Sequence, residues 1–307
     1  MHQVLLSIHG FALHSYGVLI ALGFAVGIVL AVRDARRMGM REERVLDLCF
    51  WVLIAGLVGA RILYILTNLP DYVATCREGA ASGSGRELLW KCTAVLHIWE
   101  GGLVFYGGFF GALVAVLVFA RRRSLPFLRT ADALAPALAI GHFFGRLGCY
   151  AAGCCWGRVC GAWGARFPRR SLAFEDFAAH GRLAPGQELT PPVHPTQLYE
   201  AGGELLLFFL LVLLRRRKRF DGQLFLCYLF VYPLLRGVVE IFRGDAIRKF
   251  VLPIPTPRLD RWLGLPAGEP SFLSTSQFLS ILVVVGAAAL ALALRRRARR
   301  TRAIIGA

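Results

Sequence analysis

The chain has 307 residues, of which 56% are hydrophobic and 18% are charged, and its formal net charge is +17. A soluble domain of this length has fewer apolar and more charged residues, so the composition excludes an ordinary soluble protein and indicates a polytopic membrane protein. The positive charge does not indicate a nucleic-acid partner, because the basic residues separate the apolar runs and form no basic domain of their own.

Apolar runs long enough to cross a bilayer recur along the whole chain. We therefore predict an all-α integral membrane protein with about seven transmembrane helices, in a single polytopic membrane domain that covers residues 1–307. The predicted spans are residues 15–32, 45–66, 102–120, 130–150, 194–214, 222–243 and 276–294.

The connections between the spans alternate in charge. Segments 33–44, 121–129, 215–219 and 295–302 hold 5, 4, 5 and 6 Lys or Arg residues. Because basic connections stay on the cytoplasmic side, we predict that the N-terminus lies outside and the C-terminus lies in the cytoplasm. Residues 151–193, rich in Gly, Pro and Arg, are then predicted to form a small extracytoplasmic head.

Charged residues lie on one face of a predicted transmembrane helix. Arg236, Glu240 and Arg243 are spaced four and three residues apart, so they share a helical face. A charge at the centre of a membrane helix costs about 2.5–3.5 kcal/mol, so such groups pair or face a polar interior. One interpretation is a ladder that only ties helices together. We favour the other, in which an excess of positive charge, increased by Arg61 and Arg146, binds the phosphodiester of a phospholipid.

The stretch "PPVHPTQLYE" (191–200) supports an anion site. Pro195 suits the first turn of a helix, whose free N–H groups at the predicted outer side favour an anion. His194 is either a residue of this site or a plain cap of the helix. Glu200 either pairs with an arginine or acts as a base, and pairing is the favoured role.

The stretch "GGLVFYGGFFG" (101–111) places five glycines around Tyr106. Glycine allows close approach of a backbone, a lipid or a peptide. From the glycines alone we expect helix packing, in which Gly56 and Gly59, like Gly107 and Gly111, permit close contact.

The eight cysteines fall into three groups. Cys76 and Cys92 share one predicted outer loop and are expected to form a disulfide. Cys49 and Cys227 lie within spans and are expected to pack there. Four more fall in "GCYAAGCCWGRVC" (148–160), where the spacing lacks the CxxC pairs of structural zinc, so we favour disulfides over a thiolate metal site. They are Cys149, Cys154, Cys155 and Cys160.

Several motifs, in order from about residue 10 to residue 295, give the chain a resemblance to the bacterial prolipoprotein diacylglyceryl transferase family. The strongest are "GRLGCYAAGCCWG" (145–157), "HPTQLYE" (194–200) and "YPLLRGVVEIFRGD" (232–245). The others are "HSYG" (14–17), "GAR" (59–61) and "GGLVFYGG" (101–108).

The resemblance implies a multi-pass enzyme of the bacterial inner (cytoplasmic) membrane. Such an enzyme transfers the diacylglyceryl group of phosphatidylglycerol to the lipobox cysteine thiol of a prolipoprotein signal peptide. It forms a thioether, releases glycerol phosphate, and uses no metal and no soluble cofactor. The same charges would also suit a transporter or flippase for an anionic phospholipid, although the sequence lacks the inverted repeats typical of many transporters.

The resemblance also implies roles for individual residues. The catalytic residues would be Arg146, Arg236, Tyr106 and His194. The substrate-binding residues would be Arg146, Tyr16, Arg61, Gln197, Tyr199, Glu200, Arg236, Glu240 and Arg243.

Three positions depart from the family's usual pattern. Cys149 stands where an Asn is usual, Cys154 stands where an acidic residue is usual, and Tyr106 stands where many members have His. A tyrosine, with an ordinary pKa near 10, is a poorer base than histidine at neutral pH. Either the base lies elsewhere, or Tyr106 is tuned, or its role is hydrogen bonding.

Overall fold

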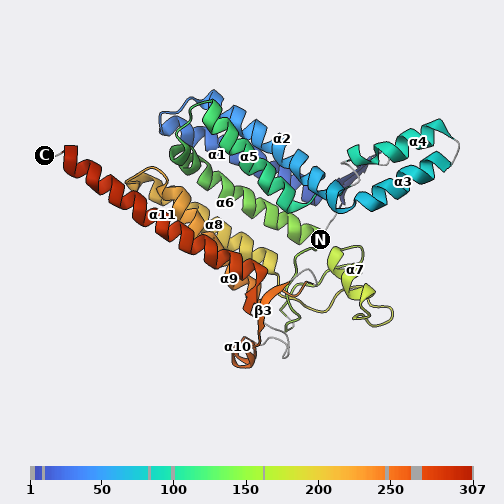
Figure 1. Cartoon of the computed structure of the whole chain (residues 1–307). Helices are drawn as coiled ribbons and strands as arrows, with labels where there is room; N and C mark the ends of the chain where they lie inside the picture. The colour runs from blue at the N-terminus through green and yellow to red at the C-terminus, as the bar shows by residue number, and fades with distance from the viewer. Residues whose placement is uncertain are drawn as a thin grey trace. The chain divides into compact units, whose positions relative to one another are not determined.

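The computed structural model describes residues 4–8, 11–81, 84–97, 101–161, 163–245, 249–263 and 272–305. Long helices account for most of them (Figure 1). The contacts divide the chain into two compact units, the first unit comprising Met1–Asp34 and Ala131–Ala307 and the second unit comprising Ala35–Thr130. The prediction of one membrane domain stays a prediction.

A helix occupies most of each of the seven predicted spans, which confirms an all-α membrane protein. These helices are α1 (Ser15–Arg37), α2 (Glu42–Thr67), α5 (Phe105–Arg122), α6 (Phe127–Ala152), α8 (Thr196–Leu214), α9 (Gln223–Ile241) and α11 (Thr275–Ile305).

Six helices among the described residues are long and apolar enough to cross a membrane. Helix α6 is not one of them, because polar side chains such as Asp132, His142 and Arg146 lower its hydropathy. The seventh crossing and the orientation of the chain in the membrane therefore stay predictions.

In the second unit, α2 and α5 approach each other through glycines, as the sequence predicts. A Cβ atom on Gly107 would lie 2.2 Å from the carbonyl oxygen of Gly59, and a Cβ atom on Gly111 would lie 2.2 Å from that of Ala55. Both distances are far below van der Waals contact. Only glycine allows these backbones to come so close.

Residues 69–96 of the second unit form α3 (Leu69–Ala81), α4 (Gly85–Cys92) and the short 3₁₀ helix η1 (Thr93–Leu96). Helices α3 and α4 pack side by side as a hairpin (Figure 1). The disulfide Cys76–Cys92 joins them, which confirms the predicted bridge.

In the first unit, α1 packs on α6, where a Cβ atom on Gly23 would lie 2.9 Å from the Cβ atom of Phe144. Helix α9 lies between α8 and α11, and Figure 1 shows α11 running along this pair. Helix α8 continues into η3 (Arg215–Arg217).

Two short antiparallel hairpins precede α1 and α11, and α10 (Pro257–Trp262) lies between the strands of the second. The strands are β1 (Val4–Ile8) with β2 (Phe11–His14), and β3 (Phe250–Ile254) with β4 (Phe272–Ser274).

The predicted head, residues 151–193, has a small core of its own and contains α7 (Leu172–Ala179). The core consists of Trp156, Phe167, Ala173, Phe177 and Val193. The head also joins the end of α9, because the backbone N–H of Arg158 donates to the carbonyl of Phe242 at 2.8 Å. These contacts fix the loop after α6 against the segments that flank α8 and α9. The extracytoplasmic location of the head stays a prediction.

The close packing of α2 on α5 makes Gly107 sensitive to the smallest substitution. We expect Gly107→Ala to lower stability by about 1–3 kcal/mol, since the added methyl group overlaps the backbone of Gly59. Thermal unfolding in detergent measures the effect. The control is Gly286→Ala in α11, where a Cβ atom meets nothing within 4 Å and helix propensity favours alanine. Equal melting temperatures for the two variants would contradict this packing.

Candidate active site

One buried carboxylate lies at the centre of the charged residues of the first unit. Glu200 of α8 is only 1% exposed. Its Oε1 lies 2.9 Å from Nη2 of Arg146 on α6, and its Oε2 lies 3.5 Å from Nη1 of Arg236 on α9. Glu200 thus brings together two guanidinium groups that belong to two other helices.

The neighbouring turns of α6 and α8 extend this arrangement. His142 precedes Arg146 by one turn, and Glu204 follows Glu200 by one turn, so each pair shares a helical face. Nδ1 of His142 lies 2.7 Å from Oε1 of Glu204. The hydroxyl of Tyr232 donates to Oε1 of Glu200 at 3.4 Å. Each contact gives a buried polar group a partner where the surrounding helices are apolar.

The charged face of α9 forms the ladder that its spacing predicts. Nη2 of Arg236 lies 2.6 Å from Oε2 of Glu240, and the same oxygen lies 3.8 Å from Nη1 of Arg243. Arg243 also binds both carboxylate oxygens of Asp245, with Nε 2.8 Å from Oδ1. Arg236 is therefore held by carboxylates from two helices, and Arg243 is held by carboxylates on both sides.

The predicted positive excess is wrong for the described residues. Three guanidinium groups face three carboxylates: Arg146, Arg236 and Arg243 face Glu200, Glu240 and Asp245. The prediction failed because it added arginines from other helices but left out two carboxylates, Glu200 on α8 and Asp245 after α9. An anion could therefore bind only through arginine N–H donors that the carboxylates leave unused. Arg146 has five N–H donors, and its buried Nε has no partner among the described residues.

His194 lies just before α8 and does not cap it, since the helix begins at Thr196 with Pro195 as the N-cap. The imidazole is 3% exposed, and its Nδ1 lies 3.1 Å from the hydroxyl of Tyr199. Its buried Nε2 has no hydrogen-bond partner in the part of the chain that the structure describes. Burial lowers the pKa of His194, and the charge of Arg158 lowers it further, so the imidazole is neutral at physiological pH.

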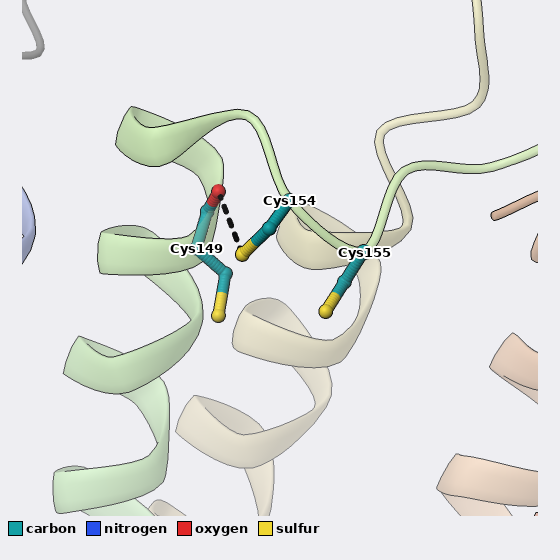
Figure 2. Close-up of side chains that lie close together, drawn as sticks. All are labelled: Cys149, Cys154 and Cys155. Atoms are coloured by element: carbon teal, nitrogen blue, oxygen red, sulfur yellow. Dashed lines mark hydrogen bonds between the residues drawn. The ribbon is translucent and has the colours of Figure 1, made fainter. Parts of the chain in front are cut away.

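Three thiols meet where α6 ends. The sulfur atoms of Cys149, Cys154 and Cys155 all lie within 4.8 Å of one another. Figure 2 shows one thiol coming from the helix and two from the loop that follows it. The pKa of the Cys155 thiol is lowered, first by hydrogen bonds with Cys149 and Cys154 and then by the charges of Arg243 and Arg146.

The structure has these three cysteines and Cys160 as free thiols, so the predicted disulfides within residues 148–160 are wrong.

Two other predicted site residues lie close to the thiol cluster. Gln197 donates from Nε2 to the carbonyl of Cys154 at 2.6 Å. Tyr16 of α1 lies against Gly148, where a Cβ atom would be 3.1 Å from its ring.

The remaining two predicted site residues, Arg61 and Tyr106, belong to the second unit. The guanidinium group of Arg61 donates to four backbone carbonyls that precede α5, and the acceptors are Ala94, Val95, Gly101 and Gly102. Arg61 thus fixes the chain that leads to Tyr106. Tyr106 lies in the first turn of α5 and is 55% exposed. Phosphate binding by Arg61 stays a prediction.

The sequence interpretation missed three members of the charged cluster, His142, Tyr232 and Asp245. His142 and Tyr232 each precede a predicted arginine, Arg146 or Arg236, by four residues. That spacing puts them on the same helical faces as the arginines, and it was the signal that could have identified them.

A cluster of paired charges buried among apolar helices defines an integral membrane protein with a polar interior site. Residues 3–293 match the family described as prolipoprotein diacylglyceryl transferase. The chain therefore belongs to this family.

Individual relatives agree with the family match. The chain is 32% identical over 307 residues to a protein of Erwinia tasmaniensis, with 96% of this chain and 92% of the relative covered. It is 31% identical to a protein of Bordetella parapertussis (94% and 93% covered) and 26% identical to one of Clostridium tetani (93% and 94% covered). All three relatives are named phosphatidylglycerol–prolipoprotein diacylglyceryl transferase.

The position of Glu200 between two arginines predicts a large effect of its neutralisation. We expect Glu200→Gln to lower stability by about 3–5 kcal/mol, because it leaves the buried guanidinium group of Arg146 without its carboxylate and removes one of the two carboxylates that hold Arg236. Thermal unfolding in detergent measures the loss. The matched control is Glu175→Gln on α7, where the side chain is exposed. A Glu200→Gln variant as stable as the control would contradict the pairing.

Proposed function

We propose that this protein transfers the diacylglyceryl group of phosphatidylglycerol to the lipobox cysteine of prolipoproteins, forming a thioether and releasing glycerol phosphate. The observation that carries the proposal is the meeting of Arg146 and Arg236 at one buried carboxylate, Glu200, in a chain of this family. Six apolar helices and the alternating basic connections support a multi-pass location in the bacterial inner membrane, with the N-terminus outside.

Arg146 and Arg236 bind the phosphate of phosphatidylglycerol in this proposal. Glu200 holds their guanidinium groups near each other, and Glu240 orients Arg236 through its 2.6 Å contact. The side chain of Arg146 is 15% exposed and retains donors for the phosphate oxygens. Because Arg243 is bound to Glu240 and Asp245, it acts on the phosphate by positioning this ladder.

The chemical step is a displacement at carbon. The peptide thiol loses its proton, and the thiolate attacks the glycerol carbon that carries the phosphate ester. The carbon–sulfur bond forms as the carbon–oxygen bond breaks, and the electron pair of that bond stays on the phosphate oxygen. The phosphodiester monoanion thus becomes a glycerol phosphate dianion. Arginine side chains stabilise this added charge more strongly in the transition state than in the ground state.

His194 is the proposed acceptor of the thiol proton. Its Nε2 lacks a hydrogen-bond partner among the described residues, and Tyr199 orients the ring through Nδ1. Tyr106 is the second candidate, and this exposed residue would suit a hydrogen bond to the peptide. Gln197 and Tyr16 border the thiol cluster and are proposed to contact substrate beside it.

The arginines give the most direct test of the proposed function. Purified protein is incubated with phosphatidylglycerol and a lipobox peptide, and mass spectrometry detects the gain of one diacylglyceryl group on the cysteine. We expect Arg146→Ala and Arg236→Ala to lower the rate by at least about 10²-fold, since each removes a donor to the developing charge. Arg146→Lys and Arg236→Lys retain a charge for folding and are expected to stay strongly impaired.

The control for these variants is Arg216→Ala, which alters an exposed arginine of η3 and is expected to keep normal turnover. Near-normal turnover of a folded Arg146→Ala or Arg236→Ala variant would contradict the role of that arginine. Lipid movement across a vesicle membrane without a mass gain on the peptide would instead support a flippase.

The role of His194 predicts a pH dependence. Because its pKa is lowered from 6.5, the imidazole is neutral and able to accept a proton at pH 7 and above. The transfer rate is expected to fall only when acidification protonates His194, at a pH below 6.5. His194→Gln should lower the rate by about 10²–10⁴-fold and remove this acid limb. An unchanged acid limb in His194→Gln would contradict this assignment of the base.

A further inference from the structure

The thiol cluster of Cys149, Cys154 and Cys155 has the dimensions of a metal site. Its three sulfur atoms lie within 4.8 Å of one another. Zinc–sulfur bonds of about 2.3 Å place the sulfur ligands of a tetrahedral site about 3.8 Å apart. Small rotations about the side-chain bonds are therefore enough to bring all three sulfurs onto one ion, and the thiols already point toward a common space (Figure 2).

Backbone hydrogen bonds hold this geometry. The N–H of Cys154 donates to the carbonyl of Cys149 at 3.1 Å, which closes the loop onto the end of α6. Gln197 donates to the carbonyl of Cys154 at 2.6 Å, and Thr196 donates to that of Cys155 at 2.7 Å. Cys155 has a φ of 57°, a conformation that non-glycine residues adopt only where the surroundings impose it. The first turn of α8 thus fixes both loop cysteines.

The cluster lies near positive charge and is partly exposed. Three thiolates and one divalent cation would have a net charge of −1. The guanidinium groups of Arg146 and Arg243 act electrostatically on Cys155, while each also faces a carboxylate. All three cysteine residues are partly exposed.

We propose that Cys149, Cys154 and Cys155 bind one thiophilic divalent cation, best matched by zinc, whose open fourth position takes the thiol of the incoming peptide. This inference rests on the proposed transfer to a cysteine thiol. Three protein ligands with one open position are typical of catalytic zinc, whereas structural zinc has four. The family resemblance implies no metal, so this proposal differs from it. The difference lies at Cys149 and Cys154, two positions where this sequence departs from the family's usual pattern.

A bound cation would promote deprotonation of the peptide thiol, for which Tyr106 is a poor base at neutral pH. Coordination to zinc deprotonates a thiol, so the peptide sulfur binds as thiolate and its proton passes to His194 or to solvent. The sulfur then forms the bond to the glycerol carbon, the carbon–oxygen bond breaks, and the phosphate leaves with the electron pair. The oxidation state of the metal does not change. Cys149 lies three residues after Arg146 on α6, so sulfur and phosphate would meet at one end of that helix.

Metal binding is tested on the full-length protein, purified in detergent under reducing conditions and loaded with Co²⁺ or Zn²⁺. We expect one ion per chain and, with Co²⁺, the absorption of thiolate-to-cobalt charge transfer. Cys149→Ser, Cys154→Ser and Cys155→Ser should each weaken binding by at least about tenfold. Cys160→Ser, which alters a free thiol outside the cluster, should bind like the wild type. Failure to bind, a disulfide among the three cysteines, or equal binding by all variants would overturn the site.

The open position is tested with peptides. Adding a lipobox peptide to the Co²⁺-loaded protein should increase the charge-transfer absorption, whereas the same peptide with Ser in place of Cys should not. Removing the metal with a chelator should lower transfer at least about tenfold, and zinc should restore it. Full transfer by metal-free protein would overturn this inference while the proposed function stands. Absence of transfer by metal-loaded protein, with the cysteine-dependent spectrum intact, would overturn the proposed function instead.

Discussion

The site depends on the burial of Glu200 between Arg146 and Arg236. A charge among apolar helices is tolerated only where an opposite charge and hydrogen bonds replace the water that it loses. Glu200 provides this for guanidinium groups from α6 and α9, and Tyr232 donates a further hydrogen bond to it. The same contact that permits burial also decides that the two arginines lie together. Stability and chemistry therefore share one interaction.

Charge balance changes how this site is understood. An unpaired cluster of arginines would attract any anion. In a cluster whose charges are balanced, the directions of the hydrogen-bond donors decide which anion binds. A phosphate that gains charge during the reaction makes better use of such fixed donors than a phosphate that only binds. The thiol cluster adds a second fixed element next to Arg146. Sulfur ligands and phosphate donors at one end of α6 fit a reaction in which sulfur displaces phosphate.

The sequence by itself determined the helical elements and the residues that share a helical face. Apolar runs require helices because the backbone must satisfy its own hydrogen bonds in a bilayer, and a helix occupies most of each predicted span. The ladder of Arg236 and Glu240 follows from their spacing along one helix. Close contact through Gly107 and the Cys76–Cys92 bridge were also predictable, since small size and a shared loop are local properties.

Only the tertiary structure decided which charges and thiols meet. The partner of Arg146 is on another helix, and helical periodicity does not specify how two helices are rotated against each other. The sequence also did not reveal that the N–H groups of Arg61 donate to backbone carbonyls, because those carbonyls lie more than 30 residues away along the chain. It also did not reveal that Cys149 meets Cys154 and Cys155 as thiols, because the turn at Cys155 depends on contacts with the start of α8. Spacing along the chain fixes faces, whereas distances between segments arise only from packing.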